Sequence, residues 1–576
     1  MEITTITQAM QLHAQILKSG HDHNGITSVQ SQQNLSKLFT FSALSSSGDL
    51  SYARLILNSL PSPNSYFYNT MIRAYSDSHD PMQALHFFLK MLDRPIPNTP
   101  RPDKFTFPFV LKSCSKLRRT RFGSQLHGLL EKFGLGEDLY INNALIHMYS
   151  GCGVSEFALK VFDKMIEKDV VSWTSIIDGL VDNDKPIKAI ELFEQMVENG
   201  IEFNQATVVS VLRACADTGA LTIGRQVHNL VKEKKLRLDG KVCTALIDMY
   251  AKCGCIDTAA VVFNETVNKD VVAWTVMIAG RASHGQSEEA IKLFEQMKNL
   301  EIKPDERTLT SVLAACRNAG WDSKGLALFR GMKKYKIRPT VQHYGCLVDM
   351  LAQAGRLEEA EQVIKKVPVE LDAMLWSTLI SACKIHGDLA RSERLMKHLE
   401  PLNIEPECES YALGDVSSTV GRSQEKDKIV ASMNRRGLAK VPGHSRIEIN
   451  GKIHEFVAGD LQHLEVDKIY EKMIEVEENL RGQGYDPKLC EAFLRIDNEE
   501  KGFQLLHHSE KLAVSFGLTQ TSPGTPIMIV KNLRCCEDCH SFMSLLSKVY
   551  QRNIMIRDRV RIHHFRNGDC SCQNNW

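Results

Sequence analysis

The chain has 576 residues, which is too long for one hydrophobic core, so we expect several domains or a repeat array. Its 70 Lys and Arg residues balance 69 Asp and Glu residues, which argues against a strongly basic nucleic-acid binder but allows binding through hydrogen bonds and local patches. No apolar run approaches the roughly 18 residues of a membrane-spanning helix, so we expect no membrane partner.

The N-terminal segment carries no recognisable targeting signal. It lacks the apolar stretch of a secretory peptide and the arginine-rich character of a transit peptide. The tripeptide Gln-Leu-His at 11–13 recurs at 125–127, and 226–228 reads Gln-Val-His. The chain therefore begins inside a repeat. We expect either a half-repeat at the start or an incomplete N-terminus from which any targeting signal is missing.

An internal repeat dominates residues 65–372. Cys114, Cys215 and Cys316 recur at a constant spacing of 101 residues. That period divides into units of 35, 35 and 31 residues, as in 170–204, 205–239 and 240–270. Periods of this length are typical of solenoids built from stacked helix pairs.

Each unit reads as two amphipathic helices. In 170–204, apolar residues recur at helical spacing in both halves, with Pro186 in the first turn of the second helix and Gly200 after its end. Asp184 is predicted to cap that second helix. Because neither helix can bury its apolar face alone, we expect the stack itself to be the core. The recurring Trp, Met and Cys residues are interpreted as packing residues.

Short polar side chains recur at the fifth and last positions of the units. Two hydrogen-bonding side chains per repeat are what recognition of single-stranded RNA, one base per repeat, requires. Helix capping explains the last positions equally well, whereas Asn or Thr inside a helix is harder to explain in that way. The fifth positions are Asn69, Asn143, Thr174, Thr244 and Thr275, and the last positions are Asp103, Asp169, Asn204, Asp270 and Asp305.

A metal-binding pattern stands near the C-terminus. His508-Ser509-Glu510 is followed by Cys536 and Cys539 in a C-x-x-C motif. One imidazole and two thiolates leave the fourth position of tetrahedral zinc open for water, whose pKa the metal lowers. A glutamate two residues after the histidine serves as the proton carrier in zinc-dependent nucleobase deaminases. A purely structural zinc site is the alternative that the motif leaves open.

A second group of potential ligands follows. Five of the 16 cysteines lie between Cys535 and Cys572, a density that indicates metal binding. A closed tetrahedral site is possible among His540, His563, His564, Cys570 and Cys572. Cys535 is interpreted as a small buried residue. The arginines of the tail are interpreted either as a phosphate-binding group or as solvated surface charge.

Taken in order, these motifs resemble those of the P-L-S class of plant pentatricopeptide repeat proteins that end in a DYW deaminase domain. The resemblance covers nearly the whole chain and includes Pro442-Gly443, His508–Ala513, Lys531–Arg534, Cys536–His540 and Cys570–Cys572. It implies an α-solenoid of helix-turn-helix repeats followed by a small α/β zinc-dependent deaminase-like domain.

The implied domains are a repeat array over 1–372, clearest over 65–372, degenerate extension repeats over 373–440, and a PG box with the deaminase domain over 441–576. The resemblance also implies two zinc ions. The catalytic zinc would bind His508, Cys536 and Cys539, with Glu510 as the catalytic residue. The structural zinc would bind His540, His563, Cys570 and Cys572, which leaves His564 as a neighbour.

The implied function is site-specific C-to-U editing of an organellar transcript, in a plastid or a mitochondrion. By the family's code, Asn with Asp reads U, Thr with Asn reads A, and Thr with Asp reads G. One alternative is an RNA-binding specificity factor with a silent deaminase domain that acts through other editing factors. It is motivated by Asn574-Asn575-Trp576, where the family ends in Asp-Tyr-Trp. A tetratricopeptide-like protein scaffold is the other alternative, although its repeats would keep a constant length of about 34 residues.

Overall fold

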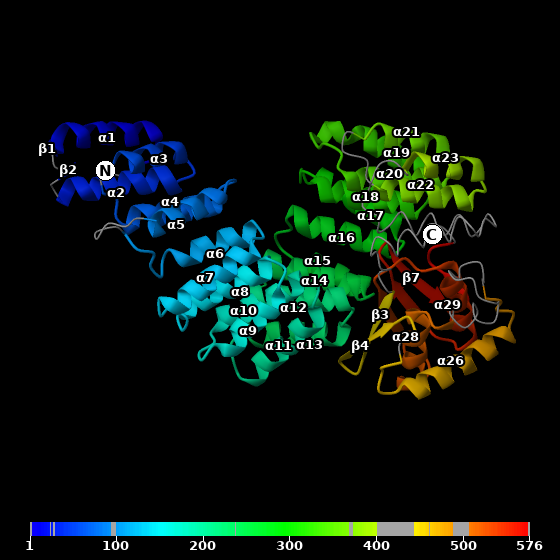
Figure 1. The fold of residues 1–576 in the computed structure, drawn as a ribbon. Helices are drawn as coiled ribbons and strands as arrows, with labels where there is room; N and C mark the ends of the chain where they lie inside the picture. The colour runs from blue at the N-terminus through cyan, green and yellow to red at the C-terminus, as the bar shows by residue number, and fades with distance from the viewer. Residues whose placement is uncertain are drawn as a thin grey trace. The chain divides into compact units, whose positions relative to one another are not determined.

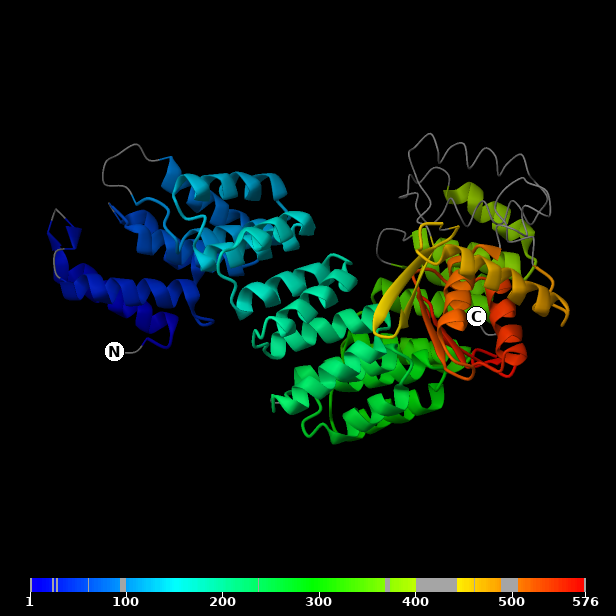
Figure 2. The same cartoon turned by 90° about the horizontal axis from the view of Figure 1, so that it is seen from below.

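The structure, a computed structural model, describes residues 3–22, 25–26, 29–60, 62–93, 100–236, 238–367, 373–399, 443–459, 461–487 and 506–573. The chain divides into two compact units, Met1–Val211 and Leu212–Trp576. Figures 1 and 2 show their helices and strands from two sides. Among the described residues, no helix is both long and apolar enough to cross a membrane.

The first unit is a stack of antiparallel helices, with α12 (Gln205–Thr218) running across its boundary. Its other elements are α1 (Ile6–Gly20), β1 (His21–Asp22), β2 (Gly25–Ile26), α2 (Val29–Leu44), α3 (Leu50–Ser59), α4 (Ser65–Asp77), α5 (Met82–Leu92), α6 (Phe107–Lys116), α7 (Thr120–Lys132), α8 (Leu139–Gly151), α9 (Ser155–Lys164), α10 (Val170–Asp182) and α11 (Pro186–Glu198). Within the stack, α8 packs against its pair partner α9 and against α6 and α10, the first helices of the neighbouring pairs.

The second unit continues the same repeat and adds a different domain. Its paired helices are α13 (Leu221–Glu233), α14 (Gly240–Lys252), α15 (Ile256–Glu265), α16 (Val271–Ser283), α17 (Ser287–Asn299), α18 (Glu306–Asn318), α19 (Asp322–Gly331) with the short 3₁₀ helix η1 (Met332–Tyr335), α20 (Val341–Gln353), α21 (Leu357–Lys365), α22 (Ala373–Ile385) and α23 (Leu389–Leu399). The extension unit 407–440 and Pro442 lie outside the described residues.

Local chemistry sets where the helices begin and end. Asp169 begins α10 with a capping box, in which its carboxylate accepts a hydrogen bond from the Ser172 amide. Between α8 and α9, Gly153 adopts a φ of +82°, a left-handed conformation that closes many helices. The prediction for Asp184 is wrong. It has a φ of +55° in the turn itself, so it takes the place that glycine holds elsewhere, and Lys185 precedes α11 without capping it.

The residues that mark the sequence period are packing residues, as predicted. Cys114, Cys215 and Cys316 are at most 1% exposed, and Trp173 and Trp274 are each 5% exposed. Their side chains fill the space between neighbouring helices, where burying apolar surface stabilises the stack. The predicted solenoid followed by a small α/β domain is confirmed.

The C-terminal domain is built on a six-stranded sheet in the order β4-β3-β5-β6-β7-β8, in which only β5 and β6 run parallel. The strands are β3 (His444–Ile449), β4 (Lys452–Val457), β5 (Ile527–Lys531), β6 (Ile554–Arg557), β7 (Ile562–Arg566) and β8 (Asp569–Cys570). Three helices, α26 (Val466–Arg481), α28 (Ser509–Gln520) and α29 (Glu537–Val549), share a hydrophobic core with the sheet that includes Ile529, Ile556 and Phe542.

The polar–apolar alternation from Glu448 to Ala458 is typical of strand structure, and the structure places the end of β3 and the whole of β4 there. β3 and β4 pair as an antiparallel hairpin, and Asn450-Gly451 forms its turn with φ values of +53° and +77°. A two-residue turn with positive φ at both positions is favoured by Asn-Gly, because neither residue is strongly penalised there. The alternation of polar and apolar residues continues through Asn450-Gly451, so the sequence does not show where β3 ends and β4 begins.

Candidate metal centres and nucleic-acid interface

The first predicted zinc cluster comes together at the start of two helices. His508 immediately precedes α28, Cys536 immediately precedes α29, and Cys539 lies in the first turn of α29. The Nδ1 atom of His508 is 3.5 Å from the Cys536 sulfur and 3.3 Å from the Cys539 sulfur. One ligand atom of each residue lies within 4.8 Å of the others, so all three can bind a single ion.

The donor chemistry of this cluster fits zinc. One nitrogen and two sulfur ligands match the set of a catalytic site that keeps one position open. Hydrogen bonds from Cys539 and His508 hold the pKa of the Cys536 thiol well below its usual value, although burial opposes this. The amino end of α29 also favours negative charge. Cys536 is therefore disposed toward the thiolate form that a metal requires, whereas burial and the hydrogen bond to Cys536 raise the pKa of Cys539.

Glu510 lies beside this cluster and is 1% exposed. Its carboxylate pairs with the ammonium of Lys531, at the end of β5, and accepts a hydrogen bond of 3.2 Å from the Ser509 hydroxyl. Burial alone would raise the pKa of Glu510, but Lys531 and His508 outweigh it and lower the pKa to about 2. A buried, ionised carboxylate at this place can accept a proton.

A second buried network ties the two ligand-bearing helices together. The Lys511 ammonium of α28 lies 2.6 Å from the Asp538 carboxylate of α29, and both side chains are at most 1% exposed. The Tyr485 hydroxyl donates to Asp538 at 2.7 Å and accepts from Lys511 at 3.0 Å. Because Lys511 and Asp538 are sequence neighbours of the cluster, this network fixes the spacing of the ligands. Sequence reasoning gave no role to Lys511, Asp538 or Lys531.

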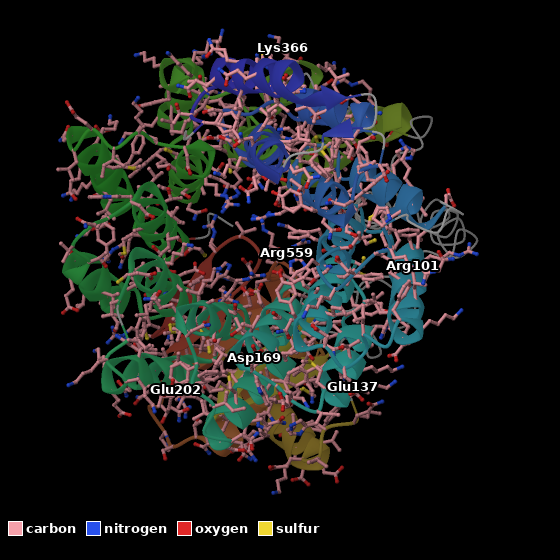
Figure 3. All side chains as sticks on the ribbon, turned by 90° about the vertical axis from the view of Figure 1, so that its left-hand side faces the viewer. Arg101, Glu137, Asp169, Glu202, Lys366 and Arg559 are labelled. Atoms are coloured by element: carbon pink, nitrogen blue, oxygen red, sulfur yellow. The ribbon has the colours of Figure 1, made fainter. Side chains whose placement is uncertain are left out.

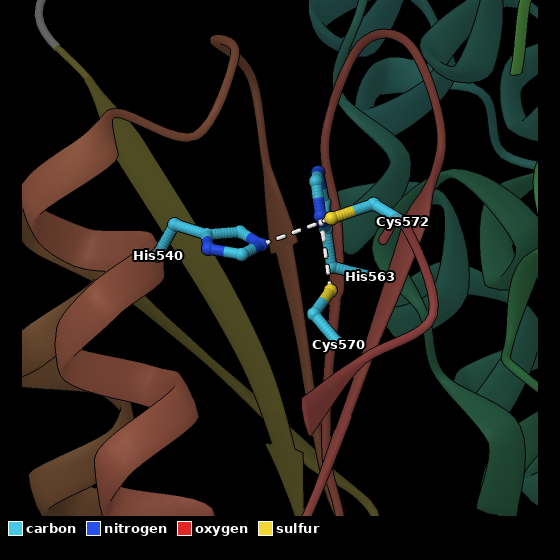
Figure 4. Close-up of side chains that lie close together, drawn as sticks. All are labelled: His540, His563, Cys570 and Cys572. Atoms are coloured by element: carbon cyan, nitrogen blue, oxygen red, sulfur yellow. Dashed lines mark hydrogen bonds between the residues drawn. The ribbon is translucent and has the colours of Figure 1, made fainter. Parts of the chain in front are cut away.

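The second predicted cluster is assembled from one helix, two strands and the turn after the last strand, as Figure 4 shows. His540 projects from α29 and its Nε2 atom lies 3.1 Å from the Cys572 sulfur. His563 projects from β7 and its Nδ1 atom lies 3.6 Å from the Cys570 sulfur of β8. The four residues can hold one ion, and four nitrogen and sulfur ligands fit a closed tetrahedral zinc site.

A carboxylate orients one ligand of this second cluster. Asp558 is paired with the Nε2 atom of His563 at 3.3 Å, which leaves Nδ1 for the cluster. The same carboxylate accepts from the Cys535 amide, and Cys535 is 2% exposed, which fits its interpretation as a buried residue. His564 lies on the other side of β7, where its Nε2 atom is 3.0 Å from Nδ1 of His284.

In the first unit, the predicted readout residues lie in contact as pairs. The Asn69 amide donates to Asp103 at 3.0 Å, and the Asn143 amide donates to Asp169 at 3.3 Å. The third pair, Thr174 and Asn204, is bridged by another side chain. The hydroxyl of Thr207 lies 2.7 Å from that of Thr174 and donates to the Asn204 side-chain oxygen at 3.1 Å.

In the second unit, Thr308 bridges Thr275 and Asp305 in the same way, with distances of 2.6 and 2.8 Å. Thr244 differs, because its hydroxyl is buried and has no hydrogen-bond partner among the described residues. Asp270 accepts from the Ala273 amide. A direct contact or a hydroxyl bridge therefore joins four of the five pairs, and Thr244 and Asp270 have no such link among the described residues.

Three of the four last-position aspartates are helix caps as well. Asp169, Asp270 and Asp305 precede α10, α16 and α18, and Figure 3 labels Asp169 among the side chains of its repeat. Their hydrogen bonds to the helix fall on Oδ1, which leaves Oδ2 as an acceptor for a ligand. Capping and readout are therefore compatible in one side chain. The half-exposed Val171 and Val272, two residues after Asp169 and Asp270, add apolar contact surface that sequence reasoning missed.

Family models match both parts of the chain. Residues 484–576 match a model described as the DYW family of nucleic acid deaminases. Residues 66–96, 143–170, 241–271 and 343–369 match a model of the PPR repeat, and 168–217 and 269–318 match the PPR repeat family.

Relatives match over almost the full length. Pentatricopeptide repeat-containing protein At1g59720, chloroplastic/mitochondrial, from Arabidopsis thaliana is 37% identical, and the match covers 99% of this chain and 91% of that protein. Pentatricopeptide repeat-containing protein ELI1, chloroplastic, from the same plant is 36% identical over 99% and 94% of the two chains. Among solved structures, that of maize PPR10 with an 18-nt psaJ RNA element aligns with a TM-score of 0.53 at 17% identity. That alignment covers 76% of this chain and 62% of PPR10, and it supports the solenoid fold.

The buried network predicts a specific effect on stability. Lys511→Met should destabilise the C-terminal domain by about 3–5 kcal/mol, because it leaves the Asp538 charge buried without its partner. Lys511→Met combined with Asp538→Leu removes both charges and should recover most of that loss. Urea unfolding of the full chain, monitored by fluorescence and circular dichroism, checks both expectations. The transition that shifts in the variants gives the change in the free energy of unfolding. Equal destabilisation by the single and double variants would contradict the role of the ion pair.

Proposed function

Because the chain belongs to the pentatricopeptide repeat proteins that end in a DYW deaminase domain, we propose that it edits RNA by converting one cytidine to uridine. The repeat array selects the site on a single-stranded organellar transcript, and the C-terminal domain carries out the deamination. The observation that supports this most directly is a three-ligand cluster with an open position beside a buried, ionised Glu510.

The residues around the cluster divide the chemistry among them. When bound by His508, Cys536 and Cys539, zinc supplies a water molecule that is acidic enough to act as a nucleophile near neutral pH. Glu510 accepts a proton from that water as the water adds to C4 of the base, and then delivers protons to N3 and to the leaving amine. The products are uridine and ammonia. Lys531 keeps Glu510 ionised, so it starts the reaction as a base.

The second cluster has a structural role in this proposal. Its four residues would supply all four ligands of a tetrahedral zinc ion, which would leave no position for a reacting water. A closed zinc site instead links α29 to β7 and to the C-terminal segment, and its binding free energy contributes to folding.

A silent deaminase domain is the second candidate. Lys531 engages the Glu510 carboxylate directly, an arrangement that occupies the proposed base. The altered ending Asn574-Asn575-Trp576 lies outside the described residues. In this case the chain would select the RNA site and another editing factor would deaminate the base. The names of the relatives, chloroplastic or chloroplastic/mitochondrial, support a plastid or mitochondrial location for either candidate.

A substitution of Glu510 distinguishes the active deaminase from the silent domain. Glu510→Gln keeps the side-chain shape but removes the proton acceptor, so deamination should fall by at least about 10²-fold while zinc and RNA binding persist. Purified wild-type and variant proteins are compared on a candidate transcript by sequencing the product. If the wild-type protein edits and the variant edits equally well, Glu510 is not the proton carrier. Wild-type protein that binds RNA but never edits favours the silent domain.

The second prediction concerns metal content. We expect two zinc ions per chain by elemental analysis. Cys572→Ser should lose one of them and lower the unfolding temperature of the domain, because it removes a ligand of the closed site. Cys535→Ser serves as the matched control, since this buried thiol belongs to neither cluster, and it should retain both ions. A wild-type content of one ion would remove the second zinc site from the proposal.

The third prediction is the RNA sequence. We apply the family's code and place the unit 341–372 at the fourth base before the edited cytidine. The preferred RNA is then U-n-U-A-n-G-G, followed by five unspecified bases and the edited C. The five readout pairs, taken from the N-terminus, specify U, U, A, G and G in that order. Selection from random RNA by the purified protein measures this preference directly.

A paired substitution tests the register of the code. Thr174→Asn with Asn204→Asp should switch the ninth base before the cytidine from A to U and leave the other positions unchanged, because an amide with a carboxylate matches a different base edge. The reverse change in the neighbouring unit, Asn143→Thr with Asp169→Asn, is the matched control and should switch only the tenth base. A change at other positions would show that the register is wrong.

A further inference from the structure

Among the described residues of the C-terminal domain, the helices α26, α28 and α29 share a core with one face of the sheet. Alternate residues of its strands point away from the core that Ile529 and Ile556 share with α28 and α29. These outward residues are cross-strand neighbours, because Met528 pairs with Met555, Met555 with His564, and Val530 with Arg557. They form one continuous face, here called the outer face, which consists of Glu448, Met528, Val530, Met555, Arg557 and His564.

The outer face contacts the turns that join paired helices of the second unit. In Figures 1 and 2, the strands lie between these repeat helices and α28 and α29. A Cβ atom added to Gly219 would lie 2.6 Å from the Val530 side chain, and one added to Gly254 would lie 2.8 Å from the Met555 sulfur. Both glycines have left-handed φ values of +77° and +83°. Two successive turns thus accept the sheet only because they have no side chain.

Arg557 caps two repeat helices at once. Its guanidinium donates to the backbone oxygens of Ala216 and Asp217, at the end of α12, and to that of Lys252 at the end of α14, the last two at 2.7 and 3.0 Å. The last carbonyl groups of a helix lack partners within the helix and carry partial negative charge. A buried arginine is therefore well matched to this pair of helix ends.

Glu448 makes the opposite contact at a helix start. Its two carboxylate oxygens accept from the amides of Thr222 and Ile223, at 2.9 and 3.2 Å, in the first turn of α13. The first amides of a helix lack intrahelical acceptors and carry partial positive charge, so a carboxylate stabilises them. No side chain of the residue before α13 caps this helix. Glu448 supplies from 225 residues away the cap that the local sequence lacks.

Two further contacts extend the same interface. His564 is hydrogen-bonded to His284, at the end of α16, and Arg317 of α18 donates to the backbone oxygen of Val560 at 3.4 Å. Four successive repeats are therefore engaged, each near the turn between its paired helices. Without them, Met528, Val530 and Met555 would present a continuous apolar patch to water.

We propose that the outer face is a docking surface for the turns of the repeats between Leu212 and Asn318, and that the partner of the deaminase domain is its own array. Arg557 and Glu448 are the two polar anchors, and the glycine turns provide the close fit. Docking fixes the distance from the catalytic cluster to the bases proposed to be read by Thr244 and Thr275. The contact needs neither RNA nor zinc, so it goes beyond the proposed function.

Hydrogen–deuterium exchange of the full chain without RNA tests this directly. The amides of Thr222 and Ile223 should exchange at least about tenfold more slowly than those of Glu288 and Glu289, because Glu448 accepts their hydrogen bonds. Glu288 and Glu289 hold the same second and third positions in α17, which also lacks a side-chain cap. Mass spectrometry with fragmentation to single residues gives the rates. Equal rates at the two helices would overturn the proposal.

Variants on both sides of the contact show whether it forms as a unit. Arg557→Ala should raise exchange at Thr222 and Ile223 at least about tenfold, although Arg557 does not touch them, and should increase peroxide oxidation of Met528 and Met555. Arg559→Ala is the matched control, because Arg559 is an exposed arginine two residues away (labelled in Figure 3) and should change neither readout. Unchanged exchange and oxidation in Arg557→Ala would overturn the proposal.

A variant in the repeat array distinguishes loss of docking from misfolding of the C-terminal domain. Thr222→Pro removes one donor to Glu448, and proline is tolerated in the first turn of a helix. It leaves the domain sequence intact, so amides of α28 and α29 should stay protected while the Ile223 amide and the two methionines become more reactive. If the methionines remain as protected as in the wild type, docking does not depend on this anchor and the proposal fails.

Discussion

Most helix pairs of the structure depend on a left-handed residue between their two helices. An α-helix can reverse tightly into an antiparallel partner when the residue after its end adopts positive φ, and glycine does so at little cost. Gly153 meets this constraint in the first unit, and Gly254, Gly285, Gly320 and Gly355 meet it in the second. The same lack of a side chain lets a β-sheet approach Gly254, so the residue that makes the repeat also shapes its surface.

The cluster of His508, Cys536 and Cys539 is also positioned by few structural elements. Two helices begin at the proposed metal ligands, and a buried ion pair between Lys511 and Asp538 holds those helix starts in register. Buried ion pairs contribute little net stability, but breaking one is costly, so such a pair selects one arrangement over others. The catalytic proposal needs that selectivity, because three ligands from two helices must keep one geometry while the fourth position stays free.

Much of the fold could be predicted because its signals are local or periodic. The recurrence of Cys114, Cys215 and Cys316 revealed the stack, and the spacing from Cys536 to Cys539 predicted a metal site whose potential ligands lie close together in the structure. The one error was local also, because Asp184 resembles a cap in sequence but occupies a turn. The alternating pattern predicted strand structure but did not show the turn between β3 and β4. Long-range partners leave no such signal. The strand residues Ile527–Val530 are apolar on both faces, which indicates that both faces are buried. The sequence does not identify which parts of the protein bury them.

The last-position side chains cap helices and are also proposed to read bases, and this combination affects how the RNA preference of such a protein can change. Asn204, Asp169, Asp270 and Asp305 each bind the third amide of the helix that follows, and asparagine, aspartate and serine cap helices about equally well. An exchange among these residues alters the group offered to a base and leaves the helix cap intact. Under the proposed readout, new RNA preferences are then reachable by single substitutions that are nearly neutral for folding. The array could accumulate such changes one repeat at a time, and selection would act on the transcript recognised rather than on the stability of the protein.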